Sequence, residues 1–231
     1  MQNLEWKRQP ASALLSDGEL QTRWNLLNQQ RGNLPFLDAA AVCTALRCFG
    51  SGTEQLLVAH AGSERVAMLL LTGASSTRWL TFQPSQLPLG GWVAESSLTA
   101  PLLARSLATS GALPLCLSLS LTQIDSALAP MELDTSTSRS DAYIDTAWVD
   151  IAGSFDDYWA QRGKNLRQNM RKQRNKLQSE GIVGSMRQLD AAADMPAAVA
   201  RYGELEGRGW KAQQGTAIKP DNVQGLSLIH I

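Results

Sequence analysis

The sequence predicts a mixed α/β (α+β) fold, in which a mixed sheet is flanked by helices. Two apolar runs, 55–60 and 65–71, are separated by a short turn containing Gly and Ser, a pattern typical of a strand hairpin. Segments with apolar residues at helical spacing lie before and after this hairpin, at 17–31 and 96–111. The chain has 231 residues, 44% of them hydrophobic, which is enough to bury one sizeable core or two small ones.

The segment 17–31 is expected to form a helix that packs one face against the rest of the molecule. Asp17 is placed to cap the first turn, and Gly32 is placed to end the last. Apolar residues recur between them at helical spacing, namely Leu20, Trp24 and Leu27.

Three more elements are predicted after the hairpin. The segment 78–82 is expected to add a third strand. A helix is predicted over 96–111, with Pro101 in its first turn and Gly111 at its end. In 113–121 leucine alternates with smaller residues, which predicts a strand with one leucine face against a core. These leucines are Leu113, Leu115, Leu117, Leu119 and Leu121.

Composition changes at 123–145, which is polar, rich in Ser and Thr and short of large apolar residues. We therefore expect an N-terminal lobe, 1–145, followed by the start of a second lobe, 146–225. In this second lobe the segments 146–151 and 182–189 are predicted to be strands.

A long basic helix is predicted between these two strands, over 155–180. Ser154 is placed to cap it, with Asp157 three residues on as an imperfect capping box, and Gly181 is placed to end it. At about 100° per residue, its apolar residues form one stripe roughly 120° wide, which we expect to be buried. The stripe consists of Phe155, Tyr158, Trp159, Leu166, Met170 and Leu177.

Basic side chains share the far side of this helix. Lys164, Arg167, Arg171 and Arg174 recur at steps of three, four and three, and 162–176 contains no acid. One interpretation is that these cations are solvated or paired with acids elsewhere in the fold. The functional interpretation is an anion-binding surface, because the planar fork of arginine suits phosphate and carboxylate.

Whole-chain composition limits the ligand classes. Lys+Arg and Asp+Glu balance at 21 each, so the net charge is zero and any attraction to nucleic acid or anionic lipid must be local. Nucleic acid is a rival ligand for the basic helix, but we find no helix-turn-helix pattern, no stacking aromatics and no dimerising heptad after the basic run. No stretch approaches the roughly 20 apolar residues of a membrane span.

Cysteine and histidine usage predicts neither a disulfide framework nor a metal site. Three cysteines without CxxC spacing or clustered histidines indicate a reducing cytoplasm. The three, Cys43, Cys48 and Cys116, are expected to be buried small hydrophobes. His60 ends a predicted strand and is interpreted as a satisfied structural residue, and His230 lies near the end of the chain.

The pattern LRQNMRKQRNKL in the basic helix, followed by a strand, a helix and GWKAQQGTAI, resembles the start of the second lobe in GNAT-type acyltransferases related to bacterial CelD proteins. The same order of lobes resembles the Fem-type peptidyltransferases. The resemblance covers about 146 to 220 and rests on the basic helix together with the residues Trp210, Lys211, Gly215, Thr216 and Ala217. The N-terminal lobe resembles the family more loosely, through 24–42 and the hairpin 56–71.

This resemblance implies transfer of an acetyl or other acyl group from acyl-coenzyme A to an amine, by direct attack of the amine on the thioester. Such chemistry needs a general base, donors that polarise the thioester carbonyl, and a helix N-terminus for the pyrophosphate. The acceptor stays open between a sugar amine, an amino acid, a peptide and a lipid-linked precursor. No metal is implied.

The family's pyrophosphate signature, Q/RxxGxG/A after a strand, does not occur in the sequence. In the family it would lie beyond residue 225, and 226–231, LSLIHI, is interpreted as a non-native tail. We therefore expect a C-terminally truncated fragment with exposed sheet edges, which is poorly soluble and does not bind acetyl-coenzyme A.

Candidate site residues also lie in the last predicted helix, 194–210, which Asp194 is placed to cap. Near its glycine-rich end Glu204 and Glu206 are weak candidates for a catalytic base, although surface carboxylates are the usual case. Trp210 and Lys211 are candidates for lining a substrate channel, and a tryptophan that anchors a loop is the alternative.

Two functions follow from the sequence. The first is a cytoplasmic acyl-coenzyme A-dependent N-acyltransferase of the GNAT superfamily, present here as a fragment. The second is a noncatalytic binding module whose basic helix docks on an acidic partner or on nucleic acid.

Overall fold

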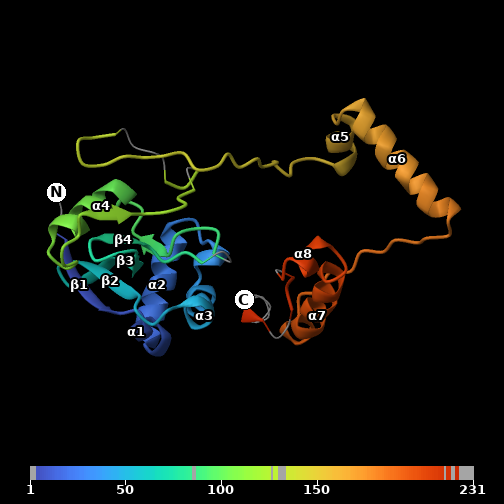
Figure 1. Ribbon diagram of the computed structural model, residues 1–231. Coiled ribbons are helices and arrows are strands. Elements are labelled where there is room, and N and C mark those ends of the chain that lie inside the picture. Colours follow the sequence, from blue (N-terminus) through green and yellow to red (C-terminus); the bar gives the residue numbers. More distant parts are fainter. Residues whose placement is uncertain are drawn as a thin grey trace. The chain divides into compact units, whose positions relative to one another are not determined.

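A computed structural model describes residues 4–84, 87–125, 127–129, 134–215, 217–219 and 222–223. By its internal contacts the chain divides into two units, and each is considered by itself. One comprises 1–141 with 191–231, and the other comprises 142–190. The first contains a mixed sheet (Figure 1), which confirms the predicted α/β (α+β) class.

The sheet is built from strands that are accompanied by helices between β1 and β2 and between β5 and β6. Its strands are β1 (Glu5–Pro10), β2 (Gln55–Ala61), β3 (Glu64–Gly73), β4 (Arg78–Thr81), β5 (Trp92–Ala94) and β6 (Ser118–Ser120). The helices of this part are α1 (Ser12–Ser16), α2 (Gly18–Gln30), the 3₁₀ helix η1 (Pro35–Leu37), α3 (Ala39–Phe49) and α4 (Ala100–Thr109).

The strands run in the order β1-β2-β3-β4-β6, and β5 also pairs with β3. All neighbours are antiparallel except β4 and β6, which are parallel. Helix α4 lies in the connection between β4 and β6, as a parallel pair requires. The sheet is therefore mixed, with its one parallel pair at the edge formed by β6.

Both faces of the sheet are covered, which explains the unbroken apolar runs in the hairpin. Leu56 and Val58 of β2 point into a core shared with α1, α2 and α3. Leu57 and Ala59 point to the opposite core, to which α4 contributes Leu103 and Leu107. The alternation of side chains along each strand thus builds a three-layer lobe.

The predicted hairpin and third strand are confirmed. β2 and β3 pair antiparallel with Leu57 opposite Leu69. Gly62, in the turn between them, has φ of +62°, a conformation that glycine adopts without steric cost. β4 pairs with the end of β3, so 78–81 forms the expected third strand.

Helix α2 also agrees with its prediction. The Asp17 carboxylate accepts hydrogen bonds from the amides of Glu19 and Leu20, which makes it the N-cap. Trp24 is fully buried and donates from Nε1 to the carbonyl of Leu37 at 2.7 Å. Gly32 follows the helix with φ of +96°.

The predicted leucine strand over 113–121 is wrong for most of its length. Only Ser118–Ser120 forms a strand, and Leu115 and Leu117 are 76% and 83% exposed. Leu113 is buried against the α4 side of the sheet. β6 lies at the sheet edge and pairs only with the short β4, so the ladder extends over few residues and leaves the preceding leucines in solvent.

The unit 142–190 contains helices α5 (Phe155–Ala160) and α6 (Lys164–Ser179) and no described strand. The strands predicted at 146–151 and 182–189 are therefore wrong: both segments are extended chain without ladder partners on either side of the helices (Figure 1). Their apolar residues are exposed. A strand needs a neighbouring strand for its backbone groups and a core for one face, and the described part of this unit supplies neither.

The last described elements are η2 (Ala192–Asp194), α7 (Met195–Glu206) and α8 (Trp210–Gln213). Asp194 stands before α7 as expected, but its side chain makes no capping hydrogen bond there. No helix within the described ranges is long and apolar enough to cross a bilayer.

Candidate functional site on helix α6

The predicted single basic helix is two helices. Ser154 caps the first as expected, because its Oγ accepts from the amide of Asp157 at 3.1 Å. The helix then stops at Gln161, and Gly163 has an extended conformation with φ of −54° and ψ of 141°. Arg162, in the break, folds back so that its guanidinium lies 4.3 Å from the centroid of the Tyr158 ring. The hydrophobic periodicity did not reveal this break.

The C-terminus of α6 agrees with the prediction. Gly181 has φ of +70°, and its amide donates to the carbonyl of Gln178 at 3.1 Å. The amide of Ile182 donates to the carbonyl of Leu177 at 2.9 Å. These two bonds form a Schellman motif, so glycine ends the helix by adopting a left-handed conformation.

The prediction of a buried apolar stripe is wrong. Because the helix is interrupted, the three aromatic residues of α5 are separated from the aliphatic residues of α6. Leu166, Met170 and Leu177 still share one side of α6, yet each is nearly half exposed. No side chain in the unit 142–190 is buried.

The four predicted cations do lie together. Lys164, Arg167, Arg171 and Arg174 all belong to the regular part of α6, and all are exposed. The only ion pair on this helix among the described residues joins Lys176 to Glu180 at 3.8 Å, so none of the four is paired with an acid there. At about 100° per residue they span a sector of about 80°.

This arrangement is suited to binding anions. Four positive charges along about 15 Å of helix repel one another, and an anionic ligand would relieve that repulsion. The first turn of α6 adds to this, because Gly163 offers no side-chain cap. Full exposure means that salt will screen any such interaction strongly.

The other candidate residues lie in the unit that contains α7 and α8. Glu206, at the end of α7, is the centre of a hydrogen-bonded cluster, and only 8% of its side chain is exposed. Its carboxylate accepts from the hydroxyl of Tyr202 at 2.7 Å, from Nζ of Lys211, and from the amide of Ile218 at 2.9 Å. These bonds, with that from Ile218 foremost, lower the pKa of Glu206 to about 2.

This cluster changes the roles of Glu206 and Lys211, and the exposure of Trp210 bears on a third candidate. A carboxylate with a pKa near 2 is a weak base at neutral pH, so Glu206 serves to fasten the segment after α7. The bond to Glu206 raises the pKa of Lys211, which keeps that side chain charged. Trp210 is 64% exposed and does not anchor the loop through burial. Glu204 is exposed and stays a prediction.

Helix α4 does not offer a phosphate-binding site at its N-terminus. The amide of Leu102 donates to Oγ1 of Thr99, and Pro101 has no amide hydrogen. The amide of Leu103 is bound by the carbonyl of Thr99 at 3.0 Å. The first turn of α4 is therefore largely closed to a pyrophosphate.

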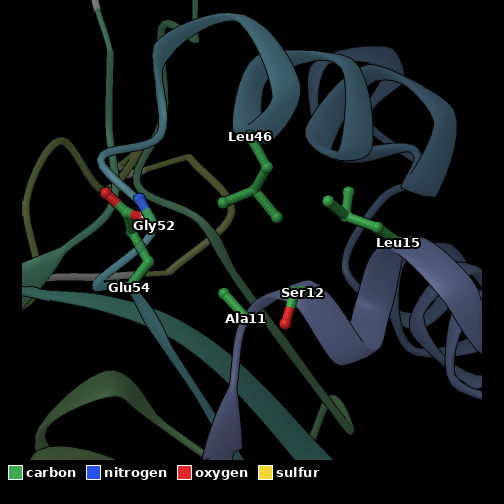
Figure 2. A pocket seen from close by; sticks show the side chains of 6 residues that line it. All are labelled: Ala11, Ser12, Leu15, Leu46, Gly52 and Glu54. Atoms are coloured by element: carbon green, nitrogen blue, oxygen red, sulfur yellow. Dashed lines mark hydrogen bonds between the residues drawn. The ribbon is translucent and has the colours of Figure 1, made fainter.

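A small cavity of about 70 Å³ lies between α1, α3 and the loop before β2. Figure 2 shows Leu15 and Leu46 directed into it, with Ala11 and Ser12 below them and the Glu54 carboxylate turned toward Gly52. That carboxylate accepts from the amide and hydroxyl of Ser51 and the amide of Gly52. The cavity has little room for a substrate, and its acid is already engaged in holding the loop.

The predictions for the cysteine and histidine residues are confirmed only in part. Cys43 is buried, whereas Cys48 and Cys116 are half-buried. Burial raises the pKa of the Cys43 thiol, which disfavours a nucleophilic thiolate. His60 is not satisfied as expected, because its buried Nδ1 has no hydrogen-bond partner among the described residues. His230 lies outside them. Across the same residues no cluster of His, Cys, Asp and Glu is placed to hold a metal.

Two pairs of interacting residues were not predicted from the sequence. Tyr202 and Glu206 are four residues apart on α7, so their spacing carried a usable signal. Arg31 and Trp92 are far apart in sequence, yet the guanidinium stacks on the indole. Only the tertiary fold reveals that second pair.

Comparison of the chain with protein-family models, with curated proteins and with solved structures found no match. The basic face of α6 and the Glu206 cluster are therefore interpreted from their own geometry and from the sequence resemblance.

Proposed function

We propose that the chain is part of an N-acyltransferase of the GNAT type, which transfers an acyl group from acyl-coenzyme A to an amine. The observation that carries the proposal is the mixed sheet, antiparallel from β1 to β4 and completed by the parallel strand β6 beyond α4. A helix-flanked mixed sheet of this kind is what the sequence resemblance implies for the first lobe. The pattern in α6 and the residues around Trp210 supply the rest of the resemblance.

In the proposed reaction the amine nitrogen attacks the carbonyl carbon of the thioester. The carbon–sulfur bond then breaks, the amine proton passes to a base, and coenzyme A leaves as its thiol. Glu204 remains a candidate base, whereas Glu206 is already engaged. Because the first turn of α4 is closed, we do not assign the pyrophosphate of the donor to the sheet lobe.

The four cations of α6 are proposed to bind an anionic group of the acceptor or of the coenzyme. Arginine suits this role because its planar fork makes paired hydrogen bonds to phosphate or carboxylate. The acceptor is proposed to be an amine on a sugar, an amino acid, a peptide or a lipid-linked precursor.

The test is release of coenzyme A thiol from acetyl-coenzyme A in the presence of amines of these four kinds. The assay is made on the chain and on the longest open reading frame that contains it. Amine-dependent thiol release is expected from the longer reading frame, and its absence there with every amine would refute the proposal. The 231-residue chain alone is expected to release none. A variant with Arg167, Arg171 and Arg174 changed to Gln should raise the KM for the anionic substrate about tenfold or more, with a smaller change in kcat.

A matched variant controls for the loss of three charges. Arg47, Arg105 and Arg201 are exposed arginines that belong to other helices and make no ion pair among the described residues. Changing these three to Gln should leave KM unchanged. An equal rise in KM for both triple variants would count against an anion-binding role for α6.

A second function, a noncatalytic binding module, is favoured by a different observation. The basic helix belongs to a unit without a buried side chain, so packing within that unit does not cover its surface. The partner would be an acidic protein or a nucleic acid. Retention on immobilised DNA that falls steeply with salt, and is lost in the triple α6 variant, would support the nucleic-acid form of this proposal.

A further inference from the structure

The unit 142–190 presents a large number of apolar side chains to solvent. None of its residues is buried. Its exposed large hydrophobics are Tyr143, Ile144, Trp148, Val149, Ile151, Phe155, Leu166, Met170, Leu177, Ile182, Val183, Met186 and Leu189. These residues are spread over two extended segments and two helices, and only those that share one face of a helix can form a common contact surface.

On α6 the apolar residues form a narrow seam. At about 100° per residue, Leu166, Met170 and Leu177 fall within a sector of about 40°. With Gln173 included, the residues follow one another at steps of four, three and four positions along the chain. This is the spacing of residues that meet a facing helix or an apolar groove, and Gln173 supplies one polar contact within it.

Cations stand on both sides of this seam. Arg174 and Arg167 lie about 60° and 80° from its centre on one side, and Lys176 lies about 100° from it on the other. Arg171 and Lys164 lie farther round, at about 120° and 140°. Any surface that covers the seam must therefore face at least two guanidinium groups at its rim, and acidic groups there would complement them.

We propose that α6 docks through this seam into an apolar groove with an acidic rim on a partner protein. The inference rests on the second of the two proposed functions, the binding module, and it names the partner's chemistry. It does not depend on acyl transfer.

Three other occupants fit the surface less well. A second copy of the chain would bring two helices of the same charge together, because α6 contains six basic and no acidic residues within Lys164–Ser179. A DNA duplex offers only scattered apolar groups, such as thymine methyls, and no continuous apolar groove to Leu166 and Leu177. A membrane interface requires a broader apolar face than a sector of about 40°, since surface helices bury one of about 100° or more.

The experiment measures binding of a fluorescent synthetic helix to the whole 231-residue chain by anisotropy. The probe has four heptads with Leu at both core positions and Glu at both flanking positions, and thus forms the simplest apolar surface with an acidic rim. A second peptide with Lys in place of Glu is the charge-reversed control. Separate arms use phosphatidylcholine vesicles with one quarter phosphatidylglycerol, and a duplex DNA of 20 base pairs.

Paired variants distinguish docking from general charge attraction. Leu166→Gln with Leu177→Gln, and Arg167→Gln with Arg174→Gln, should each weaken binding of the acidic peptide about tenfold. Lys164→Gln with Arg171→Gln removes the same two charges farther from the seam and should weaken binding about threefold or less. Circular dichroism of each variant checks that helix content is kept.

The proposal is supported by binding of the acidic peptide that depends on the seam and on the nearer arginines. It is overturned by equal losses in the two charge variants, by no effect of the leucine variant, or by no binding. Preference for the vesicles, the DNA or the Lys peptide also overturns it. Thiol release is measured separately, on the longer reading frame that carries the leucine variant. Amine-dependent release that persists there separates failure of docking from failure of the proposed enzyme.

Discussion

The guanidinium carbon of Arg31 lies 3.3 Å from the centroid of the Trp92 ring, and Nη1 of the same side chain donates to the carbonyl of Trp92 at 2.7 Å. The pair joins the C-terminus of α2 to strand β5. Burial lowers the pKa of Arg31 to about 10, which leaves it charged at neutral pH. The planar guanidinium stacks on the aromatic ring, and its charge interacts favourably with the nearby helix C-terminus. Both interactions stabilise the fold.

Arg31→Ala is therefore expected to lower the free energy of unfolding of the sheet lobe by about 2 kcal/mol. Arg31→Lys should recover only part of this, because an ammonium group lacks the planar stacking surface. Urea unfolding followed by tryptophan fluorescence measures both. Arg47→Ala, at an exposed site, should change stability by less than about 0.5 kcal/mol, and an equally small effect of Arg31→Ala would contradict the stated role.

Glu206 should make the attachment of 217–219 to α7 sensitive to acid. Its pKa of about 2 in the folded chain lies below the ordinary value of about 4.3. The stabilisation is therefore present at pH values above the ordinary pKa and is lost as pH falls through about 2. Hydrogen-exchange protection of the Ile218 amide, which donates to Glu206, should decrease over this range.

Glu206→Gln should reduce that protection at neutral pH and remove its dependence on pH between about 2 and 5. Glu204→Gln is the matched control, because Glu204 is an exposed carboxylate on the same helix. Protection that is the same in the chain and in Glu206→Gln would show that the carboxylate does not hold this segment.

Gly203→Ala is expected to destabilise the α7 region although alanine favours helix. A Cβ at this position would lie 2.3 Å from the carbonyl oxygen of Ile218, so the following segment would have to move. The usual gain of about 1 kcal/mol for Gly→Ala in a helix is then outweighed. Gly18→Ala, in the first turn of α2 with nothing within 4 Å, should be neutral or stabilising. Increased protection of the Ile218 amide in Gly203→Ala would contradict this account.

Glu54→Gln should destabilise the loop between α3 and β2. Burial acts to raise the pKa of Glu54, but hydrogen bonds from Ser51 and Gly52 outweigh it and leave the pKa below the usual range. We expect a cost of about 1–3 kcal/mol at neutral pH, because the amide can accept at one atom only. The difference between the two proteins in urea unfolding should shrink as pH falls below the ordinary carboxyl pKa, and a constant difference would contradict it.

Local patterns predicted the sheet lobe well where the elements are long and their periodicity is strong. The hairpin, α2 with its Asp17 cap, and α4 with its early proline are all in place. The errors in strand prediction have one cause in common. The leucine run at 113–121 and the segments 146–151 and 182–189 have strand-like patterns, but a pattern cannot supply the neighbouring strand that pairs with it.

Both ends of the basic segment, at Ser154 and Gly181, were predicted correctly. Its interruption and its packing were not. Arg167, Arg171 and Arg174 share a face because helical geometry depends only on spacing. The interruption at Gly163 and the exposure of the apolar seam depend on what packs nearby, as do the pairing of Glu206 with Lys211 and the contact between Gly203 and Ile218.

The sequence by itself determined the mixed α/β class through its long periodic segments. It also determined the caps Asp17 and Ser154 and the shared face of the four cations, because these depend on neighbours within a few residues. Tertiary structure alone decided that Glu206 accepts from the amide of Ile218 and that Arg31 lies on Trp92. Those outcomes require residues distant in the sequence to meet, and the free energy of such contacts is set by packing and desolvation in the folded chain.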